Sequence, residues 1–404
     1  MTLDEVSFLL SSQYSKVAER VRSMVPDSFV VEREMLRLHK KNIPFLSTVL
    51  TQISLQKKAQ DKFPEAECLL LSKDGVEQAT RRELAAYVAE RYQSYESRMD
   101  LTAGIGGDSR EILSGAKLAV AVERDPVIAM MIRHNLNQWN LSEVEVRQED
   151  AQETEIIEGA ALYCDPMRRD SMGRRTSQIS LWEPNPLACL PHWLQNACGV
   201  GIKVSPAFDY AELSASGLSP EVEMIGWGRD LKQAMWWIGD LQDSEITRRA
   251  TLLPSRWTLT DQDDVQDVEI REPRGYIVEP HTAILRAELA DQFCTRYGLA
   301  KIDEHIGYFT TDEVPEFEDP MIARVYRVMD LAKYNVRNLK RCLKTFHIDA
   351  ATIRRRGFPH HPDDVRKKLK IEEGSEFTIL LTRIGPSLYS IITERIDLQN
   401  ESEG

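Results

Sequence analysis

The chain has 404 residues, of which 42% are hydrophobic and 28% charged, and a formal net charge of −13. This length is sufficient for two or three domains, each with its own core. The composition is typical of a soluble protein and excludes a low-complexity chain. No apolar run approaches the roughly 20 residues of a membrane span, so we expect no membrane partner.

The first residues show no basic stretch followed by an apolar one, so we expect no secretory signal. The six cysteines are scattered without a CxxC pair. This usage predicts reduced thiols, a cytoplasmic protein and no metal site. The acidic net charge argues against a protein coated in basic surface. It leaves room for a local nucleic-acid face, because binding depends on where the charge lies.

Residues 1–95 are predicted to form a helical region. Apolar side chains recur there at helical intervals, including Leu9, Tyr14, Val17 and Val21. The segment Thr80-Arg-Arg-Glu83 has the form of a capping box, which predicts a helix over 84–92. The first 60 residues contain no catalytic constellation, so this region is interpreted as a helical appendage or lid.

Residues 96–260 alternate between strand and helix patterns, which is typical of a doubly wound α/β sheet. The predicted strands are 97–101, 118–122, 144–147, 160–164, 199–204, 222–227 and 250–253. Helices are predicted over 126–139 and 187–195, and the stretch 231–239 also has a helix-like pattern. The last two strand candidates, on either side of that stretch, suggest a sheet that ends in an antiparallel pair.

After the acidic stretch 261–264 the pattern changes, and we expect two further parts. Residues 261–325 form a connecting α+β segment with a helix over 282–297. Residues 326–404 form a basic domain that ends in two strands, 377–382 and 387–393. The Gly385-Pro386 pair between these strands predicts a hairpin.

The most informative motif is Asp100-Leu-Thr-Ala-Gly104-Ile-Gly106-Gly107, a strand end running into a glycine-rich turn. Glu123 closes the next strand, about 20 residues beyond the first glycine, in the layout of a βαβ unit that binds a nucleoside-containing cofactor. Glycines let the backbone approach the ligand, and the acid accepts hydrogen bonds from ribose hydroxyls. The third glycine of a nicotinamide-binding GxGxxG is missing, and no Lys-Ser/Thr pair indicates a triphosphate loop.

Three further groups of residues follow predicted strands at the same sheet edge, namely Asp150 with Ala151, the segment 165–169, and Lys203 with Ser205. Asp150, followed by Ala151, is placed to accept a hydrogen bond from an adenine amino group. Asp165 and Pro166 put a carboxylate and a rigid run of carbonyls near the reactive end of the cofactor, and Arg168 with Arg169 suits a bidentate phosphate contact.

Each of these positions also has a plainer interpretation. Glu123 can be a solvated strand end, Asp150 a helix cap, and the arginine pair a solvated turn. Lys203 and Ser205 either contact substrate or form a solvated lysine and a turn, and the second interpretation is slightly favoured. The cysteines lack the setting of a nucleophile and are interpreted as structural.

The C-terminal region contains a basic run that acids rarely interrupt. Seven basic residues fall at helix-compatible intervals, namely Arg324, Arg327, Lys333, Arg337, Lys340, Arg341 and Lys344. Arg354, Arg355 and Arg356 follow, and then the cluster 366–370. This asymmetry is typical of a phosphate-backbone contact face, on which Phe358 and the histidines 360 and 361 add rings for base stacking. A solvated charged face is an equally good reading of the run alone.

These motifs resemble those of bacterial class I S-adenosylmethionine-dependent methyltransferases that carry a THUMP-like C-terminal domain. The segments that carry the resemblance are 62–63, 75–80, 100–108, 165–169, 203–206, 248–252, 279–287, 355–358 and 381–383. The resemblance implies S-adenosylmethionine as cofactor, methyl transfer to a nucleophile, and RNA as a partner, since THUMP modules in related enzymes recognise structured RNA.

The predicted fold is a Rossmann-like methyltransferase sheet with a helical N-terminal region and an α+β THUMP-like C-terminal domain. The candidate cofactor-binding residues are Asp100, Thr102, Gly104, Gly106, Gly107, Glu123, Asp150 and Ala151. Asp165 and Pro166 are the candidate catalytic residues, and the candidate substrate contacts are Arg168, Arg169, Lys203, Arg354, Arg355 and Arg356.

One departure leaves the target atom open. Met167 and Arg168 stand where amine methyltransferases usually carry a second proline and an aromatic residue. The expected substrate is a tRNA or rRNA base. The alternatives are an RNA-binding protein with a vestigial cofactor pocket, or a methyltransferase for a small molecule or protein.

Overall fold

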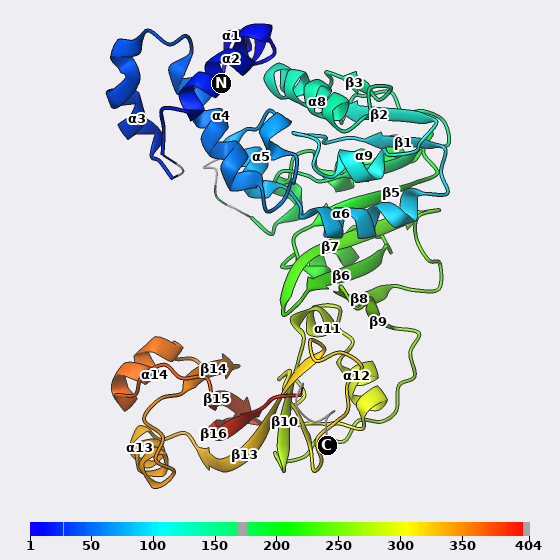
Figure 1. Cartoon of the computed structure of the whole chain (residues 1–404). Helices are drawn as coiled ribbons and strands as arrows, with labels where there is room; N and C mark the ends of the chain where they lie inside the picture. The colour runs from blue at the N-terminus through cyan, green and yellow to red at the C-terminus, as the bar shows by residue number, and fades with distance from the viewer. Residues whose placement is uncertain (27, 169–173, 175, 399–404) are drawn as a thin grey trace. The chain divides into compact units, whose positions relative to one another are not determined.

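The computed structural model describes residues 1–26, 28–168, 174 and 176–398 (Figure 1). The chain divides into two compact units. The first comprises 1–220 with 236–242, and the second comprises 221–235 with 243–404. None of the helices in the described ranges has the length and apolar character needed to cross a membrane. The predicted boundaries at 95, 260 and 325 remain a prediction.

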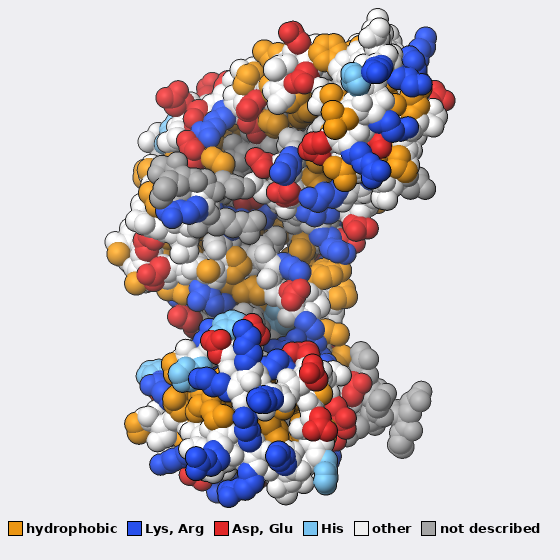
Figure 2. All heavy atoms as spheres, turned by 90° about the vertical axis from the view of Figure 1, so that its left-hand side faces the viewer, with side chains coloured by type: hydrophobic (Ala, Val, Ile, Leu, Met, Phe, Trp, Pro, Cys, Tyr) orange, Lys and Arg blue, Asp and Glu red, His pale blue; other side chains and the backbone are white. Residues whose placement is uncertain are grey.

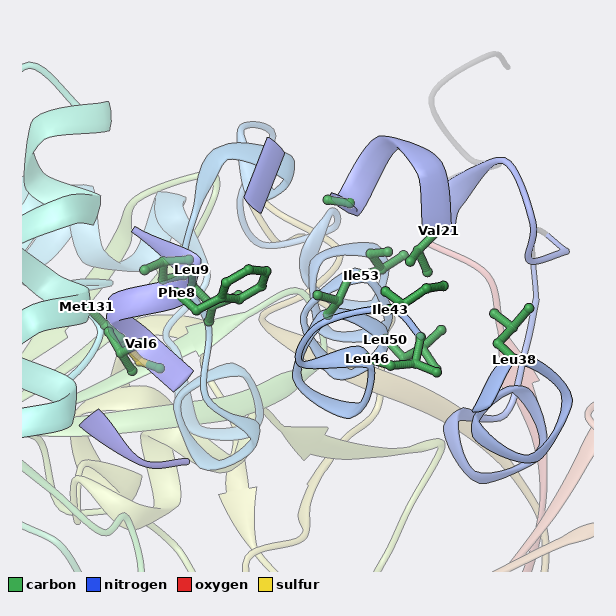
Figure 3. Packing of buried hydrophobic residues seen from close by; sticks show 13 residues of the cluster. Val6, Phe8, Leu9, Val21, Leu38, Ile43, Leu46, Leu50, Ile53 and Met131 are labelled. Atoms are coloured by element: carbon green, nitrogen blue, oxygen red, sulfur yellow. The ribbon is translucent and has the colours of Figure 1, made fainter. Parts of the chain in front are cut away.

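The N-terminal part of the first unit is helical, as predicted. Its helices are α1 (Leu3–Leu9), α2 (Ser12–Arg22), α3 (Val31–Leu38), η1 (His39–Lys41), α4 (Leu46–Ala59), η2 (Ala66–Cys68), α5 (Lys73–Gln78), α6 (Arg82–Ala89) and η3 (Glu90–Tyr92). Apolar side chains of α1, α2, α3 and α4 form one buried cluster, in which Val6, Val21 and Leu50 are fully buried. Figure 3 shows Val6 of α1 beside Met131 of α8 (Pro126–Gln138), a helix of the sheet region. This region is therefore packed onto the α/β core by burial of apolar surface.

The first sheet has the strand order β3-β2-β1-β4-β5-β7-β6-β8-β9. Its strands are β1 (Ser97–Asp100), β2 (Leu118–Val122), β3 (Glu145–Arg147), β4 (Ala161–Cys164), β5 (Gly199–Val204), β6 (Glu221–Trp227), β7 (Asp230–Gly239), β8 (Arg248–Leu253) and β9 (Trp257–Thr260). The remaining helices of this part are α7 (Ser109–Ile112), η4 (Ile179–Leu181), α9 (Pro186–Trp193) and α10 (Tyr210–Ala215). The first five strands pair in parallel, so the predicted doubly wound sheet is confirmed.

One prediction for the far side of this sheet is wrong, and a second is only partly correct. The stretch 231–239 is strand β7 and not a helix. Its residues 233–237 are buried without alternation, and such a short apolar run has no periodicity that separates strand from helix. The sheet does end in an antiparallel pair, but this pair is β8 with β9, whereas the two predicted strands, β6 and β8, pair in parallel.

The second sheet has the order β11-β12-β10-β13-β16-β15-β14. Its strands are β10 (Tyr276–Pro280), β11 (Ala300–Lys301), β12 (Phe309–Thr311), β13 (Ala323–Lys333), β14 (Thr352–Arg356), β15 (Phe377–Ile384) and β16 (Ser387–Ile396). The predicted C-terminal hairpin is confirmed, because β15 and β16 pair antiparallel across Gly385-Pro386.

The helices of this part are α11 (Thr282–Arg286), α12 (Ala290–Tyr297), α13 (Val336–Thr345) and α14 (Pro362–Leu369). The predicted helix 282–297 is interrupted at Glu288, whose φ of 61° is left-handed and ends the helical ladder. Arg324, Arg327 and Lys333 lie on strand β13, so the predicted helical run of basic residues begins only at α13.

Candidate active site

The glycine-rich turn after β1 is held by Asp100, whose side chain is buried. Its carboxylate accepts hydrogen bonds from the backbone N–H of Thr102 at 3.0 Å and from the Ser109 hydroxyl at 2.5 Å. Burial raises the pKa of Asp100 to about 7, against the lowering effect of these two hydrogen bonds. The contacts of Asp100 are with the turn itself, and a direct contact with a cofactor stays a prediction.

The backbone of the turn requires glycine at two positions. Gly104 and Gly106 have φ values of 53° and 93°, which side-chain-bearing residues rarely adopt. A Cβ on Gly106 would lie 2.9 Å from the Trp139 ring, so this residue also allows close packing against α8 and its C-terminal cap. A Cβ on Gly107 would lie in ordinary contact with Phe63. The sequence-predicted glycines therefore build the turn and its packing.

Glu123 follows β2 and lies beside this turn. One carboxylate oxygen accepts a hydrogen bond from the backbone N–H of Gly104 at 3.0 Å, and the other oxygen accepts one from the backbone N–H of Asp125 at 2.8 Å. Burial raises the pKa of Glu123 relative to an exposed glutamate. Each carboxylate oxygen has two lone pairs, so both oxygens can still accept a hydroxyl hydrogen. The group fits a ligand that offers ribose hydroxyls.

Asp150 and Ala151 follow β3. The Asp150 carboxylate accepts from the backbone N–H of Gln152 at 2.9 Å, and the side chain is half-buried. Ala151 is buried, and its carbonyl accepts from the Trp193 indole at 2.8 Å. These contacts position the segment, and the adenine contact of Asp150 stays a prediction.

The carboxyl ends of β1, β4 and β5 bring Asp165 and Lys203 together, because the three strands are parallel neighbours. The Lys203 ammonium is buried and lies 2.7 Å from Asp165 Oδ2, 3.2 Å from Asp108 Oδ2 and 2.7 Å from Thr80 Oγ1. Burial alone would lower the pKa of Lys203, but the Asp108 and Asp165 carboxylates outweigh it and raise that pKa. Lys203 is therefore not a solvated lysine, and its predicted contact with substrate stays a prediction. It is the buried counter-ion of two carboxylates.

Asp108 and Tyr163 complete this network. The Tyr163 hydroxyl donates to Asp108 Oδ2 at 2.9 Å, and burial raises the pKa of Tyr163 well above its ordinary value. Thr80 Oγ1 also donates to Asp108 Oδ2 at 3.0 Å. The predicted capping box at Thr80 is wrong, because the N-cap of α6 is Arg81 and no side chain caps it. Thr80 belongs to the site, a role that its sequence setting did not distinguish from a cap.

Asp165 is the partly exposed member of the network, with 24% of its side chain accessible. Its backbone N–H donates to Thr102 Oγ1 at 2.6 Å, which ties the end of β4 to the glycine turn. Pro166 is buried next to it, and Arg168 Nη2 lies 3.8 Å from Asp165 Oδ1. Arg169 lies outside the described residues.

The segment after Pro166 is bound to the segment that contains Glu183. The backbone groups of Met167 and Glu183 exchange two hydrogen bonds, of 2.8 and 3.0 Å. The Glu183 carboxylate in turn forms a bidentate pair with Arg124, which directly follows Glu123. This chain of contacts couples the carboxylate predicted to bind ribose with the loop that carries Asp165.

The cysteines near the site are not arranged as nucleophiles. Cys164 is fully buried, and burial raises its pKa well above the ordinary thiol value. Burial also raises the pKa of Cys189 to about 11. A thiolate is the nucleophilic form, so these settings agree with the structural role expected from the sequence. Among the residues that the structure describes, no group of three His, Cys, Asp or Glu side chains is placed to hold a metal ion.

The basic C-terminal segment divides into exposed and enclosed residues. Arg337 and Arg341 are exposed on α13, as are Lys367 and Lys368 on α14. Figure 2 shows many Lys and Arg side chains on the lower part of the molecule, interspersed with acids. Phe358 is buried against Tyr334 and His360, so its predicted use as a stacking platform for a base is wrong.

The three consecutive arginines of β14 point to different partners. Arg354 and Arg356 both approach the buried Glu279 carboxylate, at 3.5 and 3.3 Å. Arg355 instead donates to the carbonyls of Phe358 and His360. Strand alternation explains the split, since neighbouring side chains on a strand point to opposite faces.

Comparisons with known proteins agree with this geometry. Residues 323–395 match the family of THUMP domain-like sequences. Two curated relatives, uncharacterised S-adenosylmethionine-dependent methyltransferases of Mycobacterium tuberculosis strains CDC 1551 and H37Rv, are each 29% identical over 324 residues. These matches cover 80% of this chain and 87% of each relative.

A solved structure from Porphyromonas gingivalis W83, provisionally described as a methyltransferase, has the same fold with a TM-score of 0.69. It is 20% identical, and the match covers 88% of this chain and 92% of that protein. The predicted resemblance to bacterial class I methyltransferases with a THUMP-like C-terminal domain is therefore confirmed, and so is the predicted fold class.

Proposed function

We propose that this protein transfers a methyl group from S-adenosylmethionine to a base of RNA, with tRNA or rRNA as substrate. The observation that carries the proposal is the meeting of the glycine turn, Glu123 and the Asp165–Lys203 pair at one sheet edge. Open α/β sheets bind ligands at the carboxyl ends of their strands. The names of the Mycobacterium tuberculosis relatives support the cofactor.

The residues present fit this cofactor. Glu123 has lone pairs free for ribose hydroxyls, and the turn at Gly104 and Gly106 presents backbone without side chains. Asp150 offers its second carboxylate oxygen to an adenine amino group. When bound, S-adenosylmethionine supplies an electrophilic methyl group on a sulfonium sulfur.

The protein's contribution to the reaction is positioning. Lys203 and Thr102 fix the Asp165 side chain and backbone, so that its partly exposed carboxylate can accept a hydrogen bond from the N–H or O–H of the nucleophile. This hydrogen bond aligns the nucleophile, and the Asp165 carboxylate receives the proton of the nucleophile late in the transfer. Correct orientation of this kind supplies much of the rate of a bimolecular reaction. Arg168, and Arg169 next to it in the sequence, are proposed to hold a phosphate of the substrate.

The choice of RNA rests on the C-terminal domain. Residues 323–395 contain sixteen Lys and Arg against eight Asp and Glu, in a chain whose net charge is −13. The exposed basic residues of α13 and α14 supply the phosphate contacts in this proposal. The match to THUMP domain-like sequences supports the same partner. A cytoplasmic location, consistent with six free cysteines, belongs to the proposal.

Two measurements test this function. Mass spectrometry of nucleosides from a deletion strain should show one missing methylated base, restored by the wild-type protein and by the exposed-site control Glu96→Gln but not by Asp165→Ala. An unchanged nucleoside profile would count against RNA and favour a small-molecule or protein substrate. Calorimetry should show binding of S-adenosylhomocysteine, and absence of heat would favour a vestigial pocket.

RNA binding is tested by matched pairs of charge reversals in the full chain. Arg337→Glu with Arg341→Glu alters the exposed face of α13, and Lys16→Glu with Arg20→Glu makes the same change on α2. The first pair should weaken tRNA binding at least about tenfold. It should also reduce the slope of the binding constant against salt concentration, on logarithmic axes, by the equivalent of about two phosphate contacts. The second pair should leave both quantities unchanged. Equal effects of the two pairs would contradict the assignment of the RNA face.

A further inference from the structure

The second unit contains a small polar pocket of about 120 Å³, apart from the site described above. Four arginines from three parts of the fold line it. Arg229 lies between β6 and β7, Arg324 lies on β13, and Arg354 and Arg356 lie on β14. Glu279 and His281, at the end of β10, complete the wall.

The pocket carries an excess of positive charge. The buried Glu279 carboxylate lies 3.3 Å from Arg356, 3.5 Å from Arg324 and 3.5 Å from Arg354. One carboxylate thus faces several guanidinium groups, and the Tyr326 hydroxyl donates to it as well, at 3.0 Å. Arg229 is held by the carbonyl of Ala323, and burial together with the nearby Arg324 lowers the pKa of Arg229. These arginines are only partly exposed, and partly buried cations are normally balanced by anions, so the single Glu279 carboxylate leaves the cluster short of negative charge.

Two hydrogen-bond donors in this pocket have no partner. They are the N–H groups at His281 Nε2 and Arg356 Nε, and both nitrogen atoms are buried. The His281 residue is only 5% exposed, and its Nδ1 accepts the backbone N–H of Ala283 at 3.0 Å. The ring lies against Gly226, where a Cβ would come within 2.5 Å of it. The contacts with Ala283 and Gly226 fix the position of the imidazole, which lines the pocket.

The protonation state of His281 makes it a donor. Burial, and then Arg324 and Arg229, lower its pKa to about 4, while Asp230 and Asp319 act weakly in the opposite direction. Asp230 is itself paired with Lys232 at 2.8 Å. A neutral ring that accepts at Nδ1 carries its proton on Nε2. A buried N–H without an acceptor is costly, so the pocket is incomplete without an acceptor ligand.

We propose that this pocket binds a phosphate group, which accepts from the His281 Nε2–H and from the surrounding arginines. Donors that converge from several elements suit a tetrahedral oxyanion with several oxygens, whereas a carboxylate offers only two. The volume admits such a group and not a whole nucleoside. The phosphate comes either from an RNA chain or from a free phosphate compound, and the chemistry is the same. This inference does not rest on the proposed methyl transfer.

The first test is calorimetric titration of the full chain with inorganic phosphate at constant ionic strength. The wild-type protein is expected to bind phosphate saturably. The Arg354→Gln variant is expected to bind it at least about tenfold more weakly, because a charge-assisted hydrogen bond is lost. Arg355→Gln is the matched control, because this residue lies on the same strand and outside the pocket. Its affinity should stay within about twofold of wild type. Equal affinities of the three proteins, or no saturable binding up to about 10 mM phosphate, would overturn the proposal.

A second measurement needs no variant. Wild-type crystals soaked in selenate should show an anomalous selenium peak within hydrogen-bond distance of His281 Nε2, and its absence from the pocket would overturn the proposal. Competition then identifies the source. Displacement of inorganic phosphate by a 5′-phosphorylated RNA oligonucleotide alone assigns a terminal phosphate, and equal displacement by the 5′-hydroxyl form assigns the backbone. Displacement by neither assigns a small phosphate compound. None of these readouts requires methyl transfer, so the two proposals can fail separately.

Discussion

Replacing Lys203 with methionine would remove the cation of the candidate active site while keeping a side chain of similar length. In the structure its ammonium is buried and contacts two carboxylates and the Thr80 hydroxyl. The side chains of Asp108 and Asp165 are only 16% and 24% exposed. Without Lys203 these two charges would remain enclosed together, with Asp100 buried nearby.

The expected cost follows from this enclosure. Removing one partner of a buried ion pair typically costs 3–5 kcal/mol, and the partial exposure of Asp165 places the expectation at about 3 kcal/mol. The pKa of Lys203 is raised in the folded protein, so its stabilisation is complete below the ordinary lysine pKa of about 10 and is lost only above it. The difference between wild type and variant should therefore be fully present at neutral pH.

The assay is urea unfolding followed by circular dichroism at pH 7.5. Lys117→Met is the matched control, because Lys117 pairs with Glu96 at a largely exposed site, where the expected loss is below about 1 kcal/mol. Adding Asp165→Asn to Lys203→Met should recover part of the loss by removing one unpaired charge. A loss for Lys203→Met no larger than that of the control would refute the assignment of Lys203 as a buried counter-ion.

Three further predictions concern the cofactor edge and the turn. Glu123→Ala should weaken binding of S-adenosylhomocysteine by about 1.5–3 kcal/mol in calorimetry, the value of hydrogen bonds to a charged group, and undiminished affinity would contradict the ribose contact. Gly106→Ala should lower the unfolding midpoint by more than Gly115→Ala, because both have positive φ but only Gly106 would bring a Cβ against the Trp139 ring. Overpacking of this kind adds about 1–3 kcal/mol to the backbone strain, and equal midpoints would contradict it. The pKa of Asp100 is raised to about 7, so its ionisation costs stability as pH rises from about 4 to about 7. Asp100→Asn should reduce that loss, as seen in urea midpoints at pH 5 and pH 8, and an unchanged pH dependence would show that Asp100 titrates normally.

The sequence alone determined the local features of the methyltransferase-like part. The predicted strands 118–122 and 199–204 have the observed bounds of β2 and β5, because buried parallel strands form short apolar runs between clear turn signals. The glycine turn and the acid about 20 residues beyond it are likewise local patterns, and the hydrogen bond from Gly104 to Glu123 joins them in the structure. The same reasoning identified Asp165 as the residue at the end of β4.

Only the tertiary structure decided which side chains share the site and which face the basic residues take. Thr80 and Lys203 are 123 residues apart in the chain, and nothing local to Thr80 distinguishes a helix cap from a partner of a buried lysine. The stretch 231–239 is a strand whose residues 233–237 are buried on both faces, so it lacks the alternation by which a strand is recognised in a sequence. Strand pairing also separated Arg354 and Arg356, which reach Glu279, from Arg355, which does not. Long-range packing sets these outcomes, and a local sequence pattern does not encode it.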